Sequence, residues 1–215
     1  VDGGARTVVI GLGGSASNDG GAGMLRALGA RLLDAAGSEL PEGGGPLGSL
    51  AEIDLSGLDP RLQETEIVVA CDVDNPLLGP RGAVATFSAQ KGAGPADQEL
   101  LEAALATYAA TVAAATGRDL AEIVEAPGAG AAGGVGFAAL AVLGGRVERG
   151  VELLLGLVGF AEALAGADLV VTGEGSFDHQ TLSGKAPMGV LQAAREANIR
   201  AVVVCGRTTL SPIEA

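Results

Sequence analysis

The sequence of 215 residues contains little of what binds nucleic acids or crosses membranes. Lysine and arginine number 13 against 26 acidic residues, so the formal net charge is −13. This sign disfavours a general role on nucleic acid or on anionic membranes. No apolar run approaches the ~18 residues of a membrane-spanning helix, and the two cysteines lie far apart in apolar runs. We therefore expect a cytoplasmic protein with reduced thiols and no nucleic-acid or membrane partner.

Aromatic residues are also scarce, at 2% of the chain, and tryptophan is absent. Because the apolar fraction is nevertheless 48%, alanine, leucine and valine must fill the core. Apolar strand-like runs alternate with helical patterns, which predicts an α/β protein with a largely parallel sheet. The clearest strands are expected at 7–12, 66–71, 169–172 and 199–204, and the longest helix at 97–116.

Both ends of the chain indicate a piece of a longer protein. The first residue is valine, and Ser211-Pro212-Ile213-Glu214 has the pattern of a helix start immediately before the last residue. We therefore expect further sequence on both sides.

The densest group of polar side chains lies between Asp168 and Pro187. The run 169–172 predicts a buried strand that breaks at Gly173-Glu174-Gly175 into a polar loop. Ligands of open α/β sheets bind beyond the carboxyl ends of strands. We take this loop as the centre of the site, and its ionisable, hydroxyl and amide side chains are Glu174, Ser176, Asp178, His179, Gln180, Thr181, Ser183 and Lys185.

Two glycine-rich loops, 13–23 and 127–136, each lead into an expected helix. The backbone amides of the first loop can approach an anion closely at the helix N-terminus. The alternative is a tight turn in which Asn18 or Asp19 caps the helix. The second loop can offer only amides or close packing, and the sequence leaves both roles open.

Asp72 and Asp74 follow the expected strand 66–71. Two carboxylates in this position can share a hard cation such as Mg²⁺, or they can belong to an Asx turn. Few cations are available to offset an anionic substrate, namely Arg81, Lys91, Lys185 and Arg207.

These parts favour phosphoryl transfer, because its catalysis depends mainly on positioning and charge neutralisation. A non-kinase phosphosugar- or nucleotide-binding α/β enzyme would use the same loops, and it stays open as an alternative. A binding domain without catalysis also stays open, although it has little use for carboxylates beside a lysine.

Four segments, in the same order along the chain, closely resemble the glycerate kinase type-1 family. They are GLGGSASNDGGAGMLRALGARLLDAAG, CDVDNPLLGPRGA with QKGA at 90–93, PGAGAAGGVG and TGEGSFDHQTLSGKAPMGV. The resemblance implies two α/β domains with mainly parallel sheets, one flavodoxin- or Rossmann-like and interrupted by the other. It implies that 1–165 is the inserted domain and that 166–215 begins the returning half of the interrupted one.

The same resemblance implies an enzyme that phosphorylates D-glycerate with ATP and Mg²⁺. It favours 2-phosphoglycerate over 3-phosphoglycerate as the product. Its partners are then small molecules, ATP and D-glycerate, and assembly into a homo-oligomer is left open. Family proteins also carry an N-terminal segment that this chain lacks, and we expect that segment to supply part of the site.

Residue roles follow by carrying the family motifs onto matching positions. Glu174 and Asp178 become the candidates for base and metal ligand, and Lys185 stabilises the transferring phosphate. Asp72 and Asp74 bind Mg²⁺ or orient the hydroxyl. Contacts to substrate or phosphate are expected from Ser15, Asn18, Asp19, Gly173, Gln180, Thr181 and Arg207. His179 falls where other members commonly carry Ala or Ser, so a solvent-facing loop position is favoured over acid–base catalysis.

Overall fold

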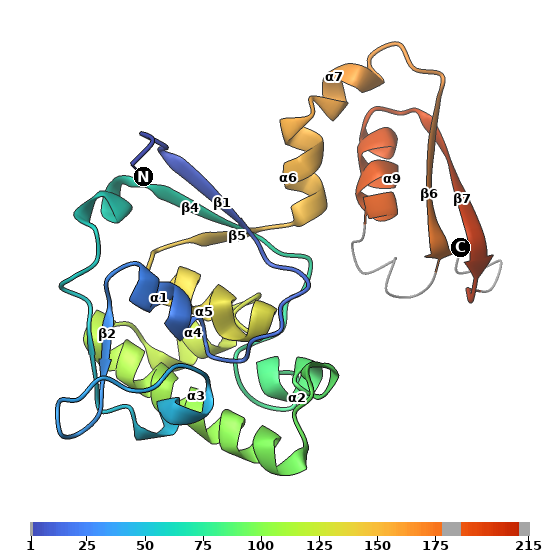
Figure 1. The fold of residues 1–215 in the computed structure, drawn as a ribbon. Helices are drawn as coiled ribbons and strands as arrows, with labels where there is room; N and C mark the ends of the chain where they lie inside the picture. The colour runs from blue at the N-terminus through green and yellow to red at the C-terminus, as the bar shows by residue number, and fades with distance from the viewer. Residues whose placement is uncertain (1, 178–185, 211–215) are drawn as a thin grey trace. The chain divides into compact units, whose positions relative to one another are not determined.

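A computed structural model of the chain describes residues 2–177 and 186–210 (Figure 1). The chain divides into two compact units, Val1–Val147 and Glu148–Ala215. The domain boundary expected near residue 165 falls within the second unit, and the insertion of one domain into the other stays a prediction. None of the described helices is long and apolar enough to span a membrane.

The first unit contains a sheet in the order β1-β4-β5 and a small sheet of β2 and β3. Its strands are β1 (Thr7–Gly11), β2 (Arg31–Leu33), β3 (Glu52–Asp54), β4 (Glu66–Ala70) and β5 (Arg146–Glu148). Its helices are α1 (Ala22–Ala27), α2 (Ala83–Phe87), α3 (Pro95–Thr116), α4 (Leu120–Glu125) and α5 (Val135–Ala141). Short 3₁₀ turns are η1 (Gly45–Ser49), η2 (Pro60–Glu64), η3 (Ala89–Lys91) and η4 (Ala131–Gly134). β1 and β4 run parallel, whereas β2 and β3 run antiparallel.

One carboxylate connects the beginnings of the three strands in the larger sheet. Glu66, the first residue of β4, accepts a hydrogen bond from Thr7 Oγ1 of β1 at 2.9 Å. It also accepts one from Arg146 Nη2 of β5 at 2.8 Å. The bond from Arg146 holds the pKa of the Glu66 carboxyl below its usual range. These hydrogen bonds connect the first residues of the three strands. The loops that follow β1 and β4 lie at the opposite ends of those strands, where a site can form.

The long helix α3 lies at the centre of the hydrophobic core of the first unit. The fully buried Tyr108 of α3 packs edge-on against Phe137 of α5, with ring centroids 5.6 Å apart. Leu105 and Val112, one turn on either side of Tyr108, are also fully buried. The sequence predicts an apolar face at Leu100, Leu101, Ala104, Leu105, Tyr108, Val112 and Ala115, and the structure confirms it except at its two ends, where Leu100 and Ala115 are exposed.

The Tyr108 hydroxyl is buried without a hydrogen-bond partner among the described residues. Burial raises the pKa of the phenol well above its usual value. A buried polar group without a partner destabilises the fold by about 1–3 kcal/mol. We therefore expect Tyr108→Phe to raise the free energy of unfolding of the first unit, measured by urea denaturation followed by circular dichroism. A lower value for Tyr108→Phe would show that the hydroxyl has a partner in solution.

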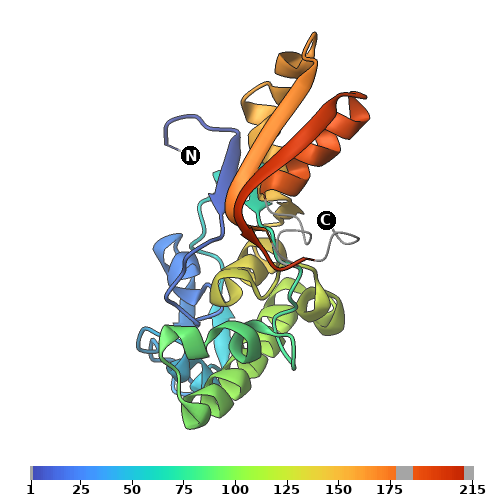
Figure 2. The same cartoon turned by 90° about the vertical axis from the view of Figure 1, so that its right-hand side faces the viewer.

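The second unit is a parallel pair of strands, β6 (Leu169–Phe177) and β7 (Arg200–Thr208), with helices α6 (Gly150–Leu157), α7 (Phe160–Leu164) and α9 (Ala186–Glu196). α9 packs along one face of the pair, as two views of the unit agree (Figure 1 and Figure 2). The side chains on the other face are exposed, namely Leu169, Val171, Val202 and Val204. The strand expected at 169–172 is present, but the expectation that it is buried is wrong for Leu169 and Val171 within this chain. Both units have parallel pairs, which confirms a mixed α/β fold with mainly parallel sheets.

The strand β6 is longer than the sequence predicts. It was expected to end at Thr172, but it continues through Gly173, Glu174 and Ser176 to Phe177. Along this extension Gly173 pairs with Val204 and Ser176 pairs with Arg207. A Cβ atom on Gly173 would lie 2.2 Å from the Val204 carbonyl oxygen, so a glycine is needed for the two strands to approach this closely. The expected loop at 173–177 is therefore a strand.

Candidate active site

A pocket of about 200 Å³ opens where the parallel strands β1 and β4 end. The loop after β1 contributes Gly13, Gly14 and Ser15 to its lining. Val73 follows β4, and Lys91 ends the 3₁₀ turn after α2. This is the edge of a parallel sheet at which ligands bind in α/β proteins. The structure thus brings together two of the loops that the sequence singles out.

Lys91 is the cation of this pocket. Its Nζ donates a hydrogen bond to the Ser17 carbonyl oxygen at 2.6 Å and lies 3.5 Å from Asn18 Oδ1. Partial burial lowers the pKa of Lys91, and the negative charge of Asp19 opposes this shift. The ammonium group therefore anchors the loop 13–23 and also lines the space in front of Ser15.

Asp19 binds the backbone at the start of the helix that follows the loop. Its carboxylate oxygens accept hydrogen bonds from the amides of Gly21 at 3.0 Å and Gly23 at 2.9 Å. The structure therefore supports the turn alternative: Gly21 is the N-cap of α1, the Asp19 carbonyl oxygen accepts the amide of Ala22, and the Asp19 carboxylate accepts that of Gly23. Direct contact of Asp19 with a substrate stays a prediction.

The second glycine-rich loop serves close packing. The amide of Gly20 donates to the carbonyl oxygen of Gly133 at 2.9 Å, so the two glycine-rich loops are hydrogen-bonded. A Cβ atom on Gly130 would lie 2.2 Å from the Pro76 carbonyl oxygen in the loop after β4. The loop 127–136 thus packs against both loops that line the pocket, and Ala132 also belongs to the lining.

Asp72 and Asp74 are exposed on either side of Val73, the residue that lines the pocket. The same loop is held by Asn75, whose Nδ2 donates to the Arg81 carbonyl oxygen at 2.7 Å. Within residues 2–177 and 186–210 there is no group of three or more His, Cys, Asp or Glu side chains that could hold a metal ion. Mg²⁺, however, is commonly held by one or two carboxylates together with substrate phosphates and water. The two carboxylates fit that mode of binding.

The second unit holds the remaining predicted residues. Glu174 is half-buried in β6, and its Oε1 has no hydrogen-bond partner among the described residues. Arg207 of β7 donates from Nε to Ser176 Oγ at 3.2 Å. Gly173 lies within β6 and offers a strand backbone rather than a loop. Outside the described residues lie Asp178, His179, Gln180, Thr181 and Lys185.

The structure adds Lys91 to the site, because this residue lines the pocket but was not among those assigned from the family motifs. The sequence held one signal for it, because Lys91 is among the few cations of an acidic chain and lies in the QKGA segment. Its contact with Ser17 joins residues 74 positions apart, and a one-dimensional pattern carries no such information. Gln90, the residue before it, also lines the pocket.

Comparison with known proteins places this geometry in a family. The model of the glycerate kinase family matches residues 1–215. The chain belongs to the glycerate kinase family. It is 47% identical over 206 residues to the glycerate kinase of Bacillus subtilis, covering 96% of this chain and 53% of that protein. It is 45% identical over 209 residues to the glycerate 2-kinase of Escherichia coli, covering 97% and 54%.

A solved structure gives the same result for the fold of this glycerate kinase family chain. A crystal structure from Salmonella typhimurium LT2 that carries a provisional glycerate kinase 2 name superposes with a TM-score of 0.85 at 48% identity. The match covers 96% of this chain and 54% of that one. The chain thus spans about half the length of the curated relatives and of the solved structure that it matches.

Proposed function

We propose that the protein containing this chain transfers the γ-phosphoryl group of ATP to D-glycerate and forms 2-phosphoglycerate. The observation that carries the proposal is the match of the glycerate kinase family model to the whole chain. The names of two relatives, glycerate kinase and glycerate 2-kinase, support the acceptor and the position of phosphorylation. ATP is the donor that the family implies, and a cytoplasmic location accords with a supply of ATP.

The pocket after β1 and β4 is our candidate for binding an anionic group, the glycerate carboxylate or a phosphate. Its volume of about 200 Å³ suits a small acid. In its lining Ser15 offers a hydroxyl and Lys91 a positive charge, and a charge-assisted hydrogen bond is roughly twice as strong as a neutral one. Asn18 lies next to the lining, with Oδ1 3.5 Å from Lys91 Nζ, and is proposed to add an amide. Asp19 acts in this proposal by fixing the loop, because its carboxylate already accepts two backbone hydrogen bonds.

The proposed transfer is a single displacement at phosphorus. The hydroxyl oxygen of glycerate forms a bond to the γ-phosphorus, and the bond from that phosphorus to the β,γ-bridging oxygen breaks. ADP leaves with the bonding electron pair, and the hydroxyl proton passes to a carboxylate base. Asp178 and Glu174 are the candidates for this base or for a metal ligand, and Lys185 stabilises the charge on the transferring group.

Further contacts and the metal ion complete the assignment. Asp72 and Asp74 would hold Mg²⁺, which when bound neutralises phosphate charge. The backbone of Gly173 and the side chain of Arg207 are proposed to contact substrate or phosphate on the second unit. Gln180 and Thr181 have the same proposed role from the sequence alone.

The test is a phosphorylation assay on the full-length protein with ATP and Mg²⁺. D-glycerate is compared with L-glycerate, lactate and glycolate, and product NMR identifies the phosphorylated carbon. We expect turnover selective for D-glycerate with phosphate on C2. Phosphate on C3 would correct the regiochemistry alone. A folded protein that binds ATP but phosphorylates none of these acceptors would instead favour a phosphosugar- or nucleotide-binding enzyme.

A further inference from the structure

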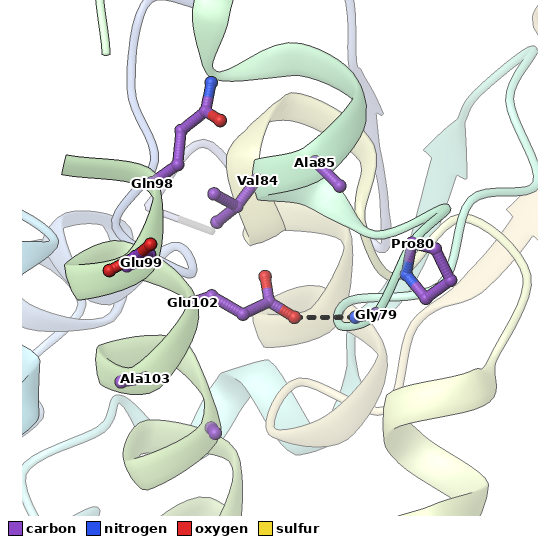
Figure 3. A pocket seen from close by; sticks show the side chains of 9 residues that line it. Gly79, Pro80, Val84, Ala85, Gln98, Glu99, Glu102 and Ala103 are labelled. Carbon is purple, nitrogen blue, oxygen red and sulfur yellow. Dashed lines mark hydrogen bonds between the residues drawn. The ribbon is translucent and has the colours of Figure 1, made fainter. Parts of the chain in front are cut away.

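An apolar groove lies between α2 and α3, outside the pocket proposed for glycerate. It has a volume of about 590 Å³, within the range of small-molecule sites. We call it the α2–α3 groove, and its lining consists of Gly79, Pro80, Val84, Ala85, Gln98, Glu99, Glu102, Ala103 and Ala106. Figure 3 shows the turn at Gly79 and Pro80 on one side and α3 on the other.

Glu102 is the polar group at the centre of this groove. Its side chain extends from α3 toward the Gly79–Pro80 turn, and Oε1 accepts the Gly79 amide at 2.6 Å (Figure 3). The other oxygen, Oε2, is buried and has no hydrogen-bond partner among the described residues. Burying a carboxylate oxygen without a donor is unfavourable, and such groups in native proteins call for an explanation.

The apolar walls and the acidic group together define what the groove would bind. Pro80, Val84 and Ala85 form an apolar wall that can cover a hydrocarbon body. The charged side chains in the lining are Glu99 and Glu102, both acidic. The Gly79 amide needs only one carboxylate oxygen, and the last torsion of a glutamate side chain is soft. Oε2 itself has no exposed surface, so the carboxylate must turn about this torsion, sharing or releasing the Gly79 amide, for Oε2 to reach a donor in the groove.

From this geometry we infer that the α2–α3 groove is a binding site for a small organic cation. The ligand has an apolar body, which contacts Val84 and Pro80, and an ammonium head, which donates to Glu102. This site goes beyond the proposed kinase reaction, whose substrates D-glycerate and ATP are both anions. The groove shares no lining residue with the pocket near Ser15. The helix α2 contributes to both, with Val84 and Ala85 in the groove and Phe87 in the pocket.

Three probes of equal size and different charge test the inference on the full-length protein. They are 2-phenylethylammonium, 2-phenylethanol and phenylacetate, titrated into protein with labelled alanine and valine methyl groups. We expect 2-phenylethylammonium to shift the methyl signals of Val84 and Ala85 and to bind at least about tenfold more tightly than the alcohol. Phenylacetate should bind more weakly than either.

The variant Glu102→Gln is the sharper test. Glutamine retains a carbonyl oxygen for the Gly79 amide but removes the negative charge, so the turn is kept. The affinity for the ammonium probe should fall about tenfold, whereas that for the alcohol should not change. Glu125→Gln is the matched control, because Glu125 is an exposed carboxylate at the end of α4, and it should bind all three probes like the wild type.

Three results would overturn the inference. Equal affinity for the three probes would mean that Glu102 plays no part in recognition. An unchanged ammonium affinity in Glu102→Gln would place the cation elsewhere. No methyl shift at Val84 and Ala85 would mean that water or another segment of the full-length protein fills the groove.

Discussion

Gly133→Ala is expected to destabilise the first unit by about 2–5 kcal/mol. Gly133 has a φ of 69°, in the left-handed region that disfavours residues with a Cβ atom. A Cβ atom there would lie 2.0 Å from the Ser17 carbonyl oxygen, which is backbone and has little freedom to move. The two glycine-rich loops would have to separate, and the 2.9 Å hydrogen bond from the Gly20 amide to the Gly133 carbonyl oxygen would be lost.

Gly144→Ala is the matched control for this result. Gly144 has a φ of 66°, close to that of Gly133, but a Cβ atom there would meet no described atom within 4 Å. Gly144→Ala should therefore lower the free energy of unfolding only by the cost of the left-handed backbone conformation, about 1–2 kcal/mol. Ala132, with a φ of 51° in the same loop as Gly133, shows that alanine can adopt this backbone region here. The measurement is urea denaturation of the full-length protein, and equal losses in the two variants would mean that the loops can separate without cost.

Close packing between distant loops is also what limits prediction from this sequence. Periodicity and β-branched runs predict β1, β4 and α3 within a few residues, because those patterns record which face of an element is buried. The glycines in 127–136 are compatible with amide donors for a ligand or with close packing. Both roles require glycine, so the sequence cannot distinguish them. The choice depends on which segment lies opposite, here the carbonyl oxygen of Ser17 across from Gly133.

The strand β6 shows a different limit. Gly173-Glu174-Gly175 is typical of a turn by local propensity, so the sequence predicts a loop there. The structure continues the strand because β7 pairs with it up to Thr208, a partner that local propensity does not report. Local sequence also fails to predict that Val171 and Val202 are exposed. Each valine lies in a continuous apolar run, which is typical of a strand buried on both faces. Within the described residues, however, only one face of the pair is covered.

The sequence singled out two of the loops that line the pocket of the first unit, but it placed the centre of the site in the loop after 169–172, most of which lies outside the described residues. The loops after β1 and β4 meet because the carboxyl ends of parallel strands lie at one edge of a sheet. Ser15 was predicted and lines the pocket, whereas the carboxylate of Asp19 is bonded to the amides of Gly21 and Gly23 at the start of α1. Lys91 comes from an element much later in the chain, and a three-dimensional contact was needed to place it.

Lys91→Met is expected to lower kcat/KM for D-glycerate by about 10²–10³-fold in the full-length protein. The substitution keeps the length of the side chain but removes the positive charge that lines the pocket beside Ser15. It also removes the 2.6 Å hydrogen bond to the Ser17 carbonyl oxygen, so the loop is less firmly held. Steady-state kinetics with D-glycerate and with ATP as the varied substrate would show which of the two binds less well.

Two further variants separate charge from loop anchoring. Lys91→Arg keeps the positive charge and a donor for Ser17, so it should recover a large part of the lost activity. Arg6→Met removes the same charge from an exposed position immediately before β1 and should leave kcat/KM unchanged. The melting temperature of Lys91→Met should stay close to that of the wild type if the charge acts on the substrate. A full loss of activity with an equally large loss of stability would instead make Lys91 a structural anchor of the loop, and wild-type kinetics in Lys91→Met would remove it from the site.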